Sequence, residues 1–193
     1  MAEKNPLQRS WFAEILSWVC VILVGFILAF LITSFVIIKT EVISGSMEST
    51  IMTGEHVLGN RLAYLFSDPE RGEIILFQNP NNENEIYIKR IIGLPGEIVR
   101  IYDGQVHIID TEGNEHTLDE PYLNEPMTRS YYESDVIPEN CYFVMGDNRN
   151  ISSDSRSWGF LERDLIYAKA WFIYWPFENF EKLDHPSYSP DED

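Results

Sequence analysis

The sequence predicts a mainly β fold, in which one N-terminal transmembrane helix is followed by an antiparallel β-sheet domain with a small inserted β subdomain. Three observations lead to this class. An uncharged apolar run near the N-terminus is long enough to cross a bilayer, short runs of β-forming residues separated by turn signals follow it, and an acidic stretch interrupts those runs. After the apolar run, the 193-residue chain has room for one good core.

The apolar run WVCVILVGFILAFLITSFVII, residues 18–38, carries no charged side chain. A helix needs roughly 20 residues of this kind to cross a bilayer. The alternative is a cleaved secretory signal, which has an apolar region of about 7 to 15 residues and a small-residue cleavage site, and the run fits neither feature. We therefore expect residues 1–17 to precede a single membrane anchor at residues 18–38.

Basic residues flank this run unequally. Lys4, Arg9 and the amino terminus come before it and Lys39 just after it, which favours a cytoplasmic N-terminus. In that orientation the chain is a single-pass protein of the cell membrane whose remaining residues lie outside the cytoplasm.

The formal net charge is −17, and all of the acidic excess lies after residue 38, so we expect no nucleic-acid partner.

Six short runs after the anchor are rich in valine, isoleucine, tyrosine and phenylalanine, and their spacing predicts an antiparallel β domain. They are HVLGN, EIILF, IYIKRII, EIVRIYDGQVHIID, CYFVMGDN and IYAKAWFIYWPF. The Asp-Gly pair in YDGQ, residues 102–105, predicts a tight hairpin turn. The segment RLAYLF, residues 61–66, predicts a short helix.

The domain boundaries follow from changes in composition. Residues 103–135 hold nine acidic side chains against one basic side chain and predict an inserted cap, which leaves residues 39–102 and 136–180 for the main β domain. Residues 181–193 are rich in proline, serine and acid, and predict a flexible acidic tail. The four histidines are scattered and no Cys/His spacing suits a metal, so we expect neither a metal nor another cofactor.

The first candidate for chemistry is Ser46, which lies between Gly45 and Met47 with Ser44 two residues before it. Glycine lets a ligand approach the backbone closely, and the two hydroxyls could act as a nucleophile and a hydrogen-bond donor. Serine and glycine are also ordinary turn residues, so a plain turn remains an alternative. A serine nucleophile needs a base, and no histidine is placed to serve as one.

Lys89 is the candidate base. It lies between Tyr87 and Ile91 at the two-residue spacing that puts side chains on one face of a strand. At pH 7 an unperturbed lysine is neutral in roughly one molecule in 2,500, and burial raises that fraction because it disfavours the ammonium. The alternative is a lysine that extends its ammonium to the sheet edge. Arg90 is adjacent but too basic to accept a proton.

The polar loop MGDNRNISSDSRSWGF, residues 145–160, has almost no apolar content before its tryptophan. In it Asp154 and Arg156 could pair, and the hydroxyl of Ser152 could orient a neutral lysine amine. A surface loop with local side-chain to backbone turns is the alternative.

Together these segments resemble the bacterial type I signal peptidases, also called leader peptidases, which are membrane-bound Ser/Lys proteases. The single anchor and short chain resemble the compact form common in Gram-positive bacteria. The resemblance rests on the anchor, SGSM at 44–47, RGEIILF at 71–77, YIKRIIGLPGE at 87–97 and GDNRNISSDSRSWG at 146–159.

The resemblance implies an enzyme, a serine endopeptidase, with Ser46 as the nucleophile and Lys89 as the general base. It implies that the hydroxyl of Ser44 and the backbone amide of Ser46 form the oxyanion hole. It also implies supporting roles for Ser152, Asp154 and Arg156, the first bonded to the lysine amine and the others paired. The implied substrate-binding residues are Val42, Met47, Ile51, Tyr87 and Ile88.

The resemblance further implies the partners. These are preproteins bearing signal peptides, cut after Ala-x-Ala-like motifs, and the lipid bilayer, at a place near the secretion translocon. Two segments depart from the family pattern: Asn150 and Ile151 replace the usual Asp-Asn after GDNR, and EST, residues 48–50, replaces the frequent proline after Met47. A noncatalytic anchored module that binds export substrates is the alternative function, and the presence of both Ser46 and Lys89 disfavours it.

Overall fold

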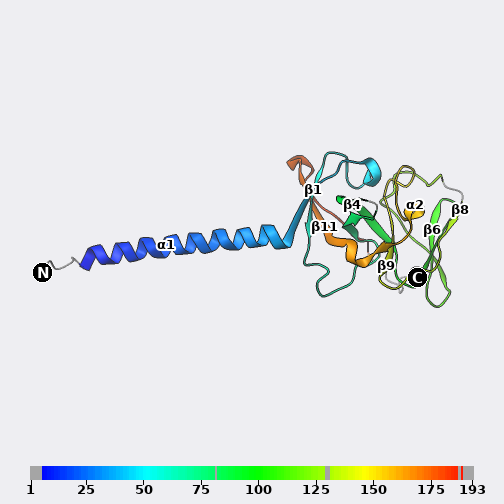
Figure 1. Cartoon of the computed structure of the whole chain (residues 1–193). Helices are drawn as coiled ribbons and strands as arrows, with labels where there is room; N and C mark the ends of the chain where they lie inside the picture. Colours follow the sequence, from blue (N-terminus) through cyan, green and yellow to red (C-terminus); the bar gives the residue numbers. More distant parts are fainter. Residues whose placement is uncertain (1–5, 81, 129–130, 187, 189–193) are drawn as a thin grey trace. The chain divides into compact units, whose positions relative to one another are not determined.

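The computed structural model describes residues 6–80, 82–128, 131–186 and 188 (Figure 1). The chain divides after Ile37 into two compact units. The first unit contains the long helix α1 (Pro6–Leu31), which continues into a π-helical turn, η1 (Ile32–Val36). The second unit contains the strands and is described separately below.

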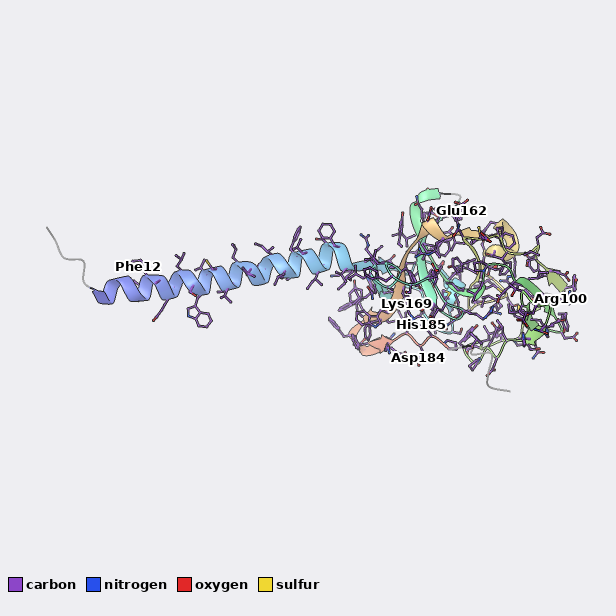
Figure 2. The ribbon with its side chains drawn as sticks, turned by 90° about the horizontal axis from the view of Figure 1, so that it is seen from below. Phe12, Arg100, Glu162, Lys169, Asp184 and His185 are labelled. Atoms are coloured by element: carbon purple, nitrogen blue, oxygen red, sulfur yellow. The ribbon has the colours of Figure 1, made fainter. Side chains whose placement is uncertain are left out.

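The helix of the first unit has the length and composition of a membrane span. From Trp11 to Val36 its mean hydropathy reaches 3.0 and its side chains are exposed, with Phe12 pointing outward in Figure 2. The apolar helix therefore begins seven residues before the predicted anchor at residues 18–38. The predicted end is also shifted, because Ile37 begins a strand and Ile38 is buried in the core of the second unit.

The second unit is built on an eight-stranded sheet with the order β1-β2-β11-β3-β4-β9-β10, and β12 pairs with β11. The pairings from β2 to β10 are antiparallel, as the sequence predicts. The strands are β1 (Ile37–Glu41), β2 (His56–Asn60), β3 (Ile74–Asn79), β4 (Asn82–Gly93), β9 (Cys141–Met145), β10 (Leu161–Glu162), β11 (Ile166–Trp175) and β12 (Glu181–Lys182).

A second, four-stranded antiparallel sheet has the order β7-β6-β5-β8. Its strands are β5 (Ile98–Tyr102), β6 (Gln105–Ile109), β7 (Glu115–Thr117) and β8 (Tyr131–Glu133). Tyr102 pairs with Gln105 across the predicted Asp-Gly hairpin, where Asp103 and Gly104 both have positive φ. The small sheet thus begins with β5 at Ile98, before the boundary predicted at residue 103. Its strands β6 and β8 lie at the end of the second unit away from β1 (Figure 1).

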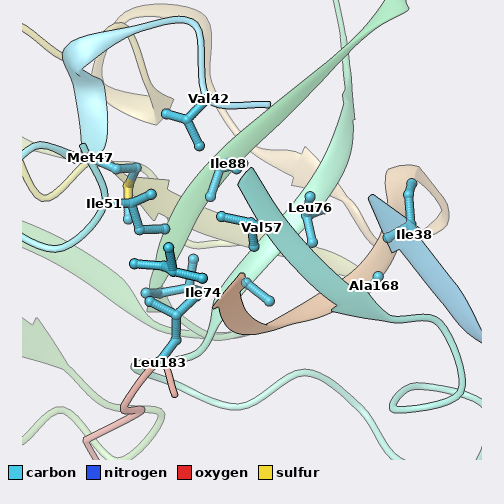
Figure 3. Close-up of a cluster of buried hydrophobic side chains, with 12 residues drawn as sticks. Ile38, Val42, Met47, Ile51, Val57, Ile74, Leu76, Ile88, Ala168 and Leu183 are labelled. Carbon is cyan, nitrogen blue, oxygen red and sulfur yellow. The ribbon is translucent and has the colours of Figure 1, made fainter. Parts of the chain in front are cut away.

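Buried apolar side chains form three clusters along the two sheets. In the first cluster Met47 and Ile51, which follow the candidate serine, point toward Val57 and Ile74 (Figure 3). All four are fully buried, and each such side chain stabilises the fold by about 1.5 to 3 kcal/mol. The segment that carries Ser46 is therefore fastened to the large sheet by its own apolar residues.

Four short helical turns complete the second unit. They are η2 (Gly45–Met47), α2 (Ser155–Trp158), η3 (Arg163–Leu165) and η4 (Phe177–Asn179). The predicted helix at residues 61–66 is wrong, because this segment forms turns and bends. Its Leu65 and Phe66 stay exposed, at 61% and 97%, so no apolar face is buried that would hold a helix together.

The prediction of a flexible tail from residue 181 is wrong for residues 181–186 and 188. Glu181 and Lys182 form β12, and Leu183 is buried in the first apolar cluster. His185 accepts a hydrogen bond from the backbone N–H of Ile74 through Nδ1, and its Nε2 lies 3.0 Å from the carbonyl oxygen of Ala170. Burial lowers the pKa of His185 to about 4, so the neutral ring can accept at one nitrogen and donate at the other. Residues 187 and 189–193 lie outside the described part of the chain.

Candidate active site

The side chains of Ser46 and Lys89 meet at the edge of the large sheet. Ser46 lies in the single turn η2, and Lys89 lies in β4. Lys89 Nζ is 2.5 Å from Ser46 Oγ and also donates to the carbonyl oxygen of Ile88, 3.1 Å away. The two groups are 43 residues apart in the sequence, and their contact is the geometry required of a nucleophile and a base.

Lys89 is a buried cation, with only 3% of its surface exposed. Burial lowers the pKa of Lys89 from 10.5 to about 8, although the carboxylates of Asp154 and Asp147 oppose the shift. At pH 7 a group with that pKa is neutral in about a tenth of molecules, against roughly one in 2,500 for a free lysine. The site therefore holds a lysine whose neutral amine is far more populated than that of a free lysine and lies beside the Ser46 hydroxyl.

Arg90 points away from Lys89 and forms a buried ion pair behind the site. Its Nε and a terminal nitrogen donate to the two carboxylate oxygens of Asp147, at 2.9 and 2.6 Å, and its other terminal nitrogen donates to the Gly72 carbonyl at 2.8 Å. Asp147 Oδ2 also accepts a 2.6 Å hydrogen bond from Thr50 Oγ1. This chain of contacts connects β4 to the segment just after Ser46, and the sequence analysis did not assign it.

Gly146 is the point where the polar loop packs against Ser46. A Cβ atom at this position would overlap the carbonyl oxygen of Ser46 and the side chain of Ser152. The backbone N–H of Asn148 donates to the same Ser46 carbonyl at 3.1 Å. A glycine is therefore required for the loop to approach Ser46, and the Gly-Asp turn signal directly after a predicted strand is the feature that could have indicated it.

Two serines lie beside the pair in different environments. Ser44 Oγ is 3.3 Å from Ser46 Oγ and is exposed toward the cleft described below. Ser152 Oγ is buried and has no hydrogen-bond partner among the described residues, so the predicted bond to the lysine amine is not formed in this geometry. Its hydroxyl lies close enough to Asp154 to help lower the pKa of that carboxyl group.

Asp154 and Arg156 form the predicted ion pair. Arg156 donates to both carboxylate oxygens at 2.8 Å, and the backbone N–H of Gly146 donates to Asp154 Oδ2 at 3.0 Å. Burial alone would raise the pKa of Asp154, but the hydrogen bond and charge of Arg156 outweigh it, so the pKa falls below its usual value. The carboxylate stays charged and holds the loop that carries Gly146.

A cleft of about 590 Å³ opens at Ser46 and Lys89 between residues 40–47 and residues 85–89. Four predicted substrate-binding residues line it, namely Val42, Met47, Tyr87 and Ile88. Ile51, the fifth, does not line the cleft, because it is fully buried beneath it in the core. Ile43, Ile86 and Ile151 also line the cleft and are exposed, at 82%, 38% and 66%. Ile43 and Ile86 were not predicted; in the sequence they are marked only as apolar residues directly beside Val42 and Tyr87, which were predicted to bind substrate.

The two departures in the polar loop have separate structural explanations. Asn150 Oδ1 accepts hydrogen bonds from the backbone N–H and the hydroxyl of Thr128, both at 3.0 Å, and its Nδ2 donates to the carbonyl of Pro126 at 3.2 Å. Asn150 therefore joins the polar loop to the insertion. Ile151 provides part of the apolar wall of the cleft.

The family model for signal peptidase, peptidase S26, matches residues 15–175 of this chain. The chain belongs to this signal peptidase family. The matched residues include the apolar helix from residue 15 on, Ser46, Lys89 and the polar loop, so the family match and the candidate site coincide.

Relatives in the family match over most of their length. Signal peptidase IB of Staphylococcus aureus (strain COL) is 32% identical over 190 residues, which cover 90% of this chain and 96% of that protein. Probable signal peptidase I-2 of Synechocystis sp. is 36% identical over 180 residues, which cover 90% of this chain and 78% of that protein. A crystal structure of a signal peptidase I from Enterococcus faecalis is 34% identical, with a TM-score of 0.47, and covers 53% of this chain and 97% of that one.

Proposed function

We propose that this family member is a membrane-anchored serine endopeptidase that removes signal peptides from exported preproteins, with Ser46 as the nucleophile and Lys89 as the general base. The 2.5 Å separation of Lys89 Nζ and Ser46 Oγ carries the proposal. The lowered pKa of Lys89 supports it, because a buried lysine near pKa 8 can accept a proton under neutral or mildly alkaline conditions.

The proposed reaction is acyl transfer. Neutral Lys89 accepts the hydroxyl proton as Ser46 Oγ attacks the scissile carbonyl carbon, and Ser44 with the Ser46 backbone amide stabilises the oxyanion. The C–N bond then breaks, and Lys89 gives its proton to the departing amine. Water next attacks the acyl-enzyme while Lys89 accepts a proton from it, and the C–Oγ bond breaks with return of that proton to Ser46.

The proposed substrate preference is cleavage after Ala-x-Ala-like motifs. The cleft beside Ser46 has a mainly apolar lining from Val42, Met47 and Ile88, which suits small aliphatic side chains. Its walls at residues 40–44 and 85–88 belong to or follow extended strands, which suits a substrate bound in extended form.

The proposed location is the cell membrane, with the N-terminus in the cytoplasm and the β domain outside it. The apolar helix Trp11–Val36 supports a single span, and the excess of Lys4 and Arg9 over Lys39 supports this orientation. A preprotein held in the same bilayer by its signal peptide would present its cleavage site near the membrane surface, beside the translocon from which it emerges. Confinement of both partners to the membrane raises their effective concentration.

The test is cleavage of a preprotein with an Ala-x-Ala site by the detergent-solubilised full chain, with the mature N-terminus identified by mass spectrometry. We expect cleavage at that site by the wild type and by Lys182→Met, a control that removes an exposed lysine of β12. Ser46→Ala and Lys89→Met should both be inactive. Wild-type rates in the Lys89→Met variant would exclude lysine as the base.

A further inference from the structure

A second hollow of about 250 Å³ is lined in part by residues that directly follow the turn with Ser46. It shares no lining residue with the larger cleft, and its walls come from residues 48–52, 124–125 and 147–150. The first group follows the nucleophile, the second belongs to the acidic insertion, and the third is the polar loop.

The walls of this hollow are attached directly to the nucleophile. The backbone N–H of Asn148 donates to the Ser46 carbonyl at 3.1 Å. On the other wall the carboxylate of Glu48 packs over Gly45, so that a Cβ atom there would lie 2.9 Å from Glu48 Cδ. A ligand in the hollow would therefore lie against the residues that flank Ser46 on both sides.

The charges around the hollow do not cancel. Asp147 is neutralised by Arg90, and Arg149 by Glu120 in a second buried pair. Glu48 accepts a hydrogen bond from Thr53 Oγ1 at 2.8 Å but has no cationic partner among the described residues.

Glu125, the other carboxylate in the walls, is exposed and likewise has no cationic partner in the described part of the chain. The remaining feature is the hydroxyl of Ser49, which is buried and without a hydrogen-bond partner among the described residues. Ser49 also has a φ of 107°, a backbone conformation that is costly for serine and marks functional segments. The hollow is thus lined by two carboxylates without a cationic partner among the described residues, beside one buried hydroxyl.

We infer that this hollow binds the first residues after the scissile bond and that Glu48 and Glu125 favour a basic side chain there. The inference rests on the proposed function. A peptide whose acyl part occupies the larger cleft continues past Ser46, and the second hollow is lined in part by Glu48, Ser49 and Met52, which follow Ser46 in the chain. An extended chain advances about 3.3 Å per residue, so the hollow is within reach of the first two or three mature residues.

This assignment also gives the acidic insertion a role in substrate recognition. Glu125 lies between Asn124 and Pro126, the residue whose carbonyl is held by Asn150. That hydrogen bond fixes the insertion beside the polar loop and keeps Glu125 at the edge of the hollow. Two carboxylates facing one bound lysine or arginine should favour it over glutamate by roughly tenfold at low salt, and less at high salt.

The test uses preproteins with one signal peptide and one Ala-x-Ala site that carry lysine, glutamine or glutamate at each of the first three mature positions. The full chain in detergent should show the order lysine, glutamine, glutamate in kcat/KM at one of these positions. Glu48→Gln and Glu125→Gln should each reduce the ratio of the lysine to the glutamate substrate, and Glu48→Lys should invert it. Glu139→Gln, which removes an exposed charge outside both hollows, should leave the ratio unchanged.

The outcomes separate this inference from the proposed function. Cleavage by all enzymes with one unchanged ratio overturns the assignment of the hollow and leaves the peptidase intact. Equal failure of the wild type and Ser46→Ala on every substrate overturns the proposed function, and this inference with it.

Discussion

Ion pairs are buried in one region of the β domain and exposed in another. The first region is the edge of the large sheet beside Ser46, and the second is the small inserted sheet. Beside Ser46, Arg90 and Asp147 form an ion pair at 2.6 Å whose side chains are at most 1% exposed. In the small sheet, Arg100 pairs with Glu133 at 2.8 Å, and these side chains are 29% and 36% exposed. Figure 2 shows Arg100 well apart from Lys169 and His185, which belong to the large-sheet region.

The difference in burial indicates how much the stability of each region depends on its ion pair. Exposed ion pairs contribute little to stability, because water already solvates both charges. Removing one partner of a buried pair is costly, because the other charge stays desolvated. Lys89 is a third case, since it is a buried cation for which the described residues provide no ion-pair partner. Burial without a counterion lowers the pKa of Lys89 to about 8, so the energetic cost of this cation appears as a larger neutral fraction of the amine.

The largest expected effect is the loss of peptide cleavage, measured as kcat/KM, in the variant Lys89→Arg. An arginine keeps its proton at every pH of interest, so we expect a loss of about 10²- to 10⁴-fold in kcat/KM, similar to Ser46→Ala. The wild-type rate should rise with pH through about 8, because burial lowers the pKa of Lys89 to about 8 and only the neutral amine is a base. Measurement of kcat/KM from pH 6 to 10 tests both points. An arginine variant with more than a tenth of wild-type activity would contradict them.

The next effect compares the two ion pairs directly. Asp147→Asn leaves Arg90 buried without its counterion and should lower the free energy of unfolding by about 3 to 5 kcal/mol. Glu133→Gln removes an exposed partner of Arg100 and should not change the unfolding midpoint measurably. Denaturant unfolding of the full chain in detergent, followed by near-ultraviolet circular dichroism, measures both. Equal shifts in the two variants would remove the distinction between the regions.

The third expected effect is a gain in stability, whereas Asp147→Asn should lose stability. The unfolded chain keeps the Lys89 proton up to about pH 10.5, whereas the folded chain releases it near pH 8, so the stability of the wild type rises between these values. Below pH 8 the folded ammonium is fully destabilising. Lys89→Met should therefore be more stable than the wild type by about 3 kcal/mol at pH 7, and this gain should vanish above pH 10.5. A gain that does not depend on pH would show that it comes from packing.

Local patterns in the sequence were sufficient to predict several elements. The alternating β-type runs predicted the antiparallel strands, and the Asp-Gly pair at residues 103–104 predicted the hairpin between β5 and β6. These features depend on neighbouring residues, so they can be recognised without the fold. The pairing of Ser46 with Lys89 was predicted from family motifs, and the contact between these side chains agrees with it.

Features that depend on distant contacts were not predicted. Arg90 and Asp147 are 57 residues apart, and only the pairing of β4 with β9 brings them together. The tail prediction was wrong because composition does not show that Leu183 and His185 pack against the large sheet. Ile51 was assigned to the cleft, although the turn after Met47 directs it into the core. In each case tertiary packing outweighs the local signal.

The smallest expected effect concerns Asn150, which connects the two regions. Its side chain exchanges neutral hydrogen bonds with Thr128 and Pro126 of the insertion at 3.0 and 3.2 Å. Asn150→Asp keeps the acceptor and loses the donor, so it should cost about 0.5 to 1.5 kcal/mol, and Asn150→Ala should cost more because it loses both. Unfolding midpoints of the two variants and the wild type measure this order. If Asn150→Ala matched the wild type in stability and in kcat/KM, the insertion would be independent of the polar loop, and Glu125 would lack the support that holds it at the edge of the second hollow.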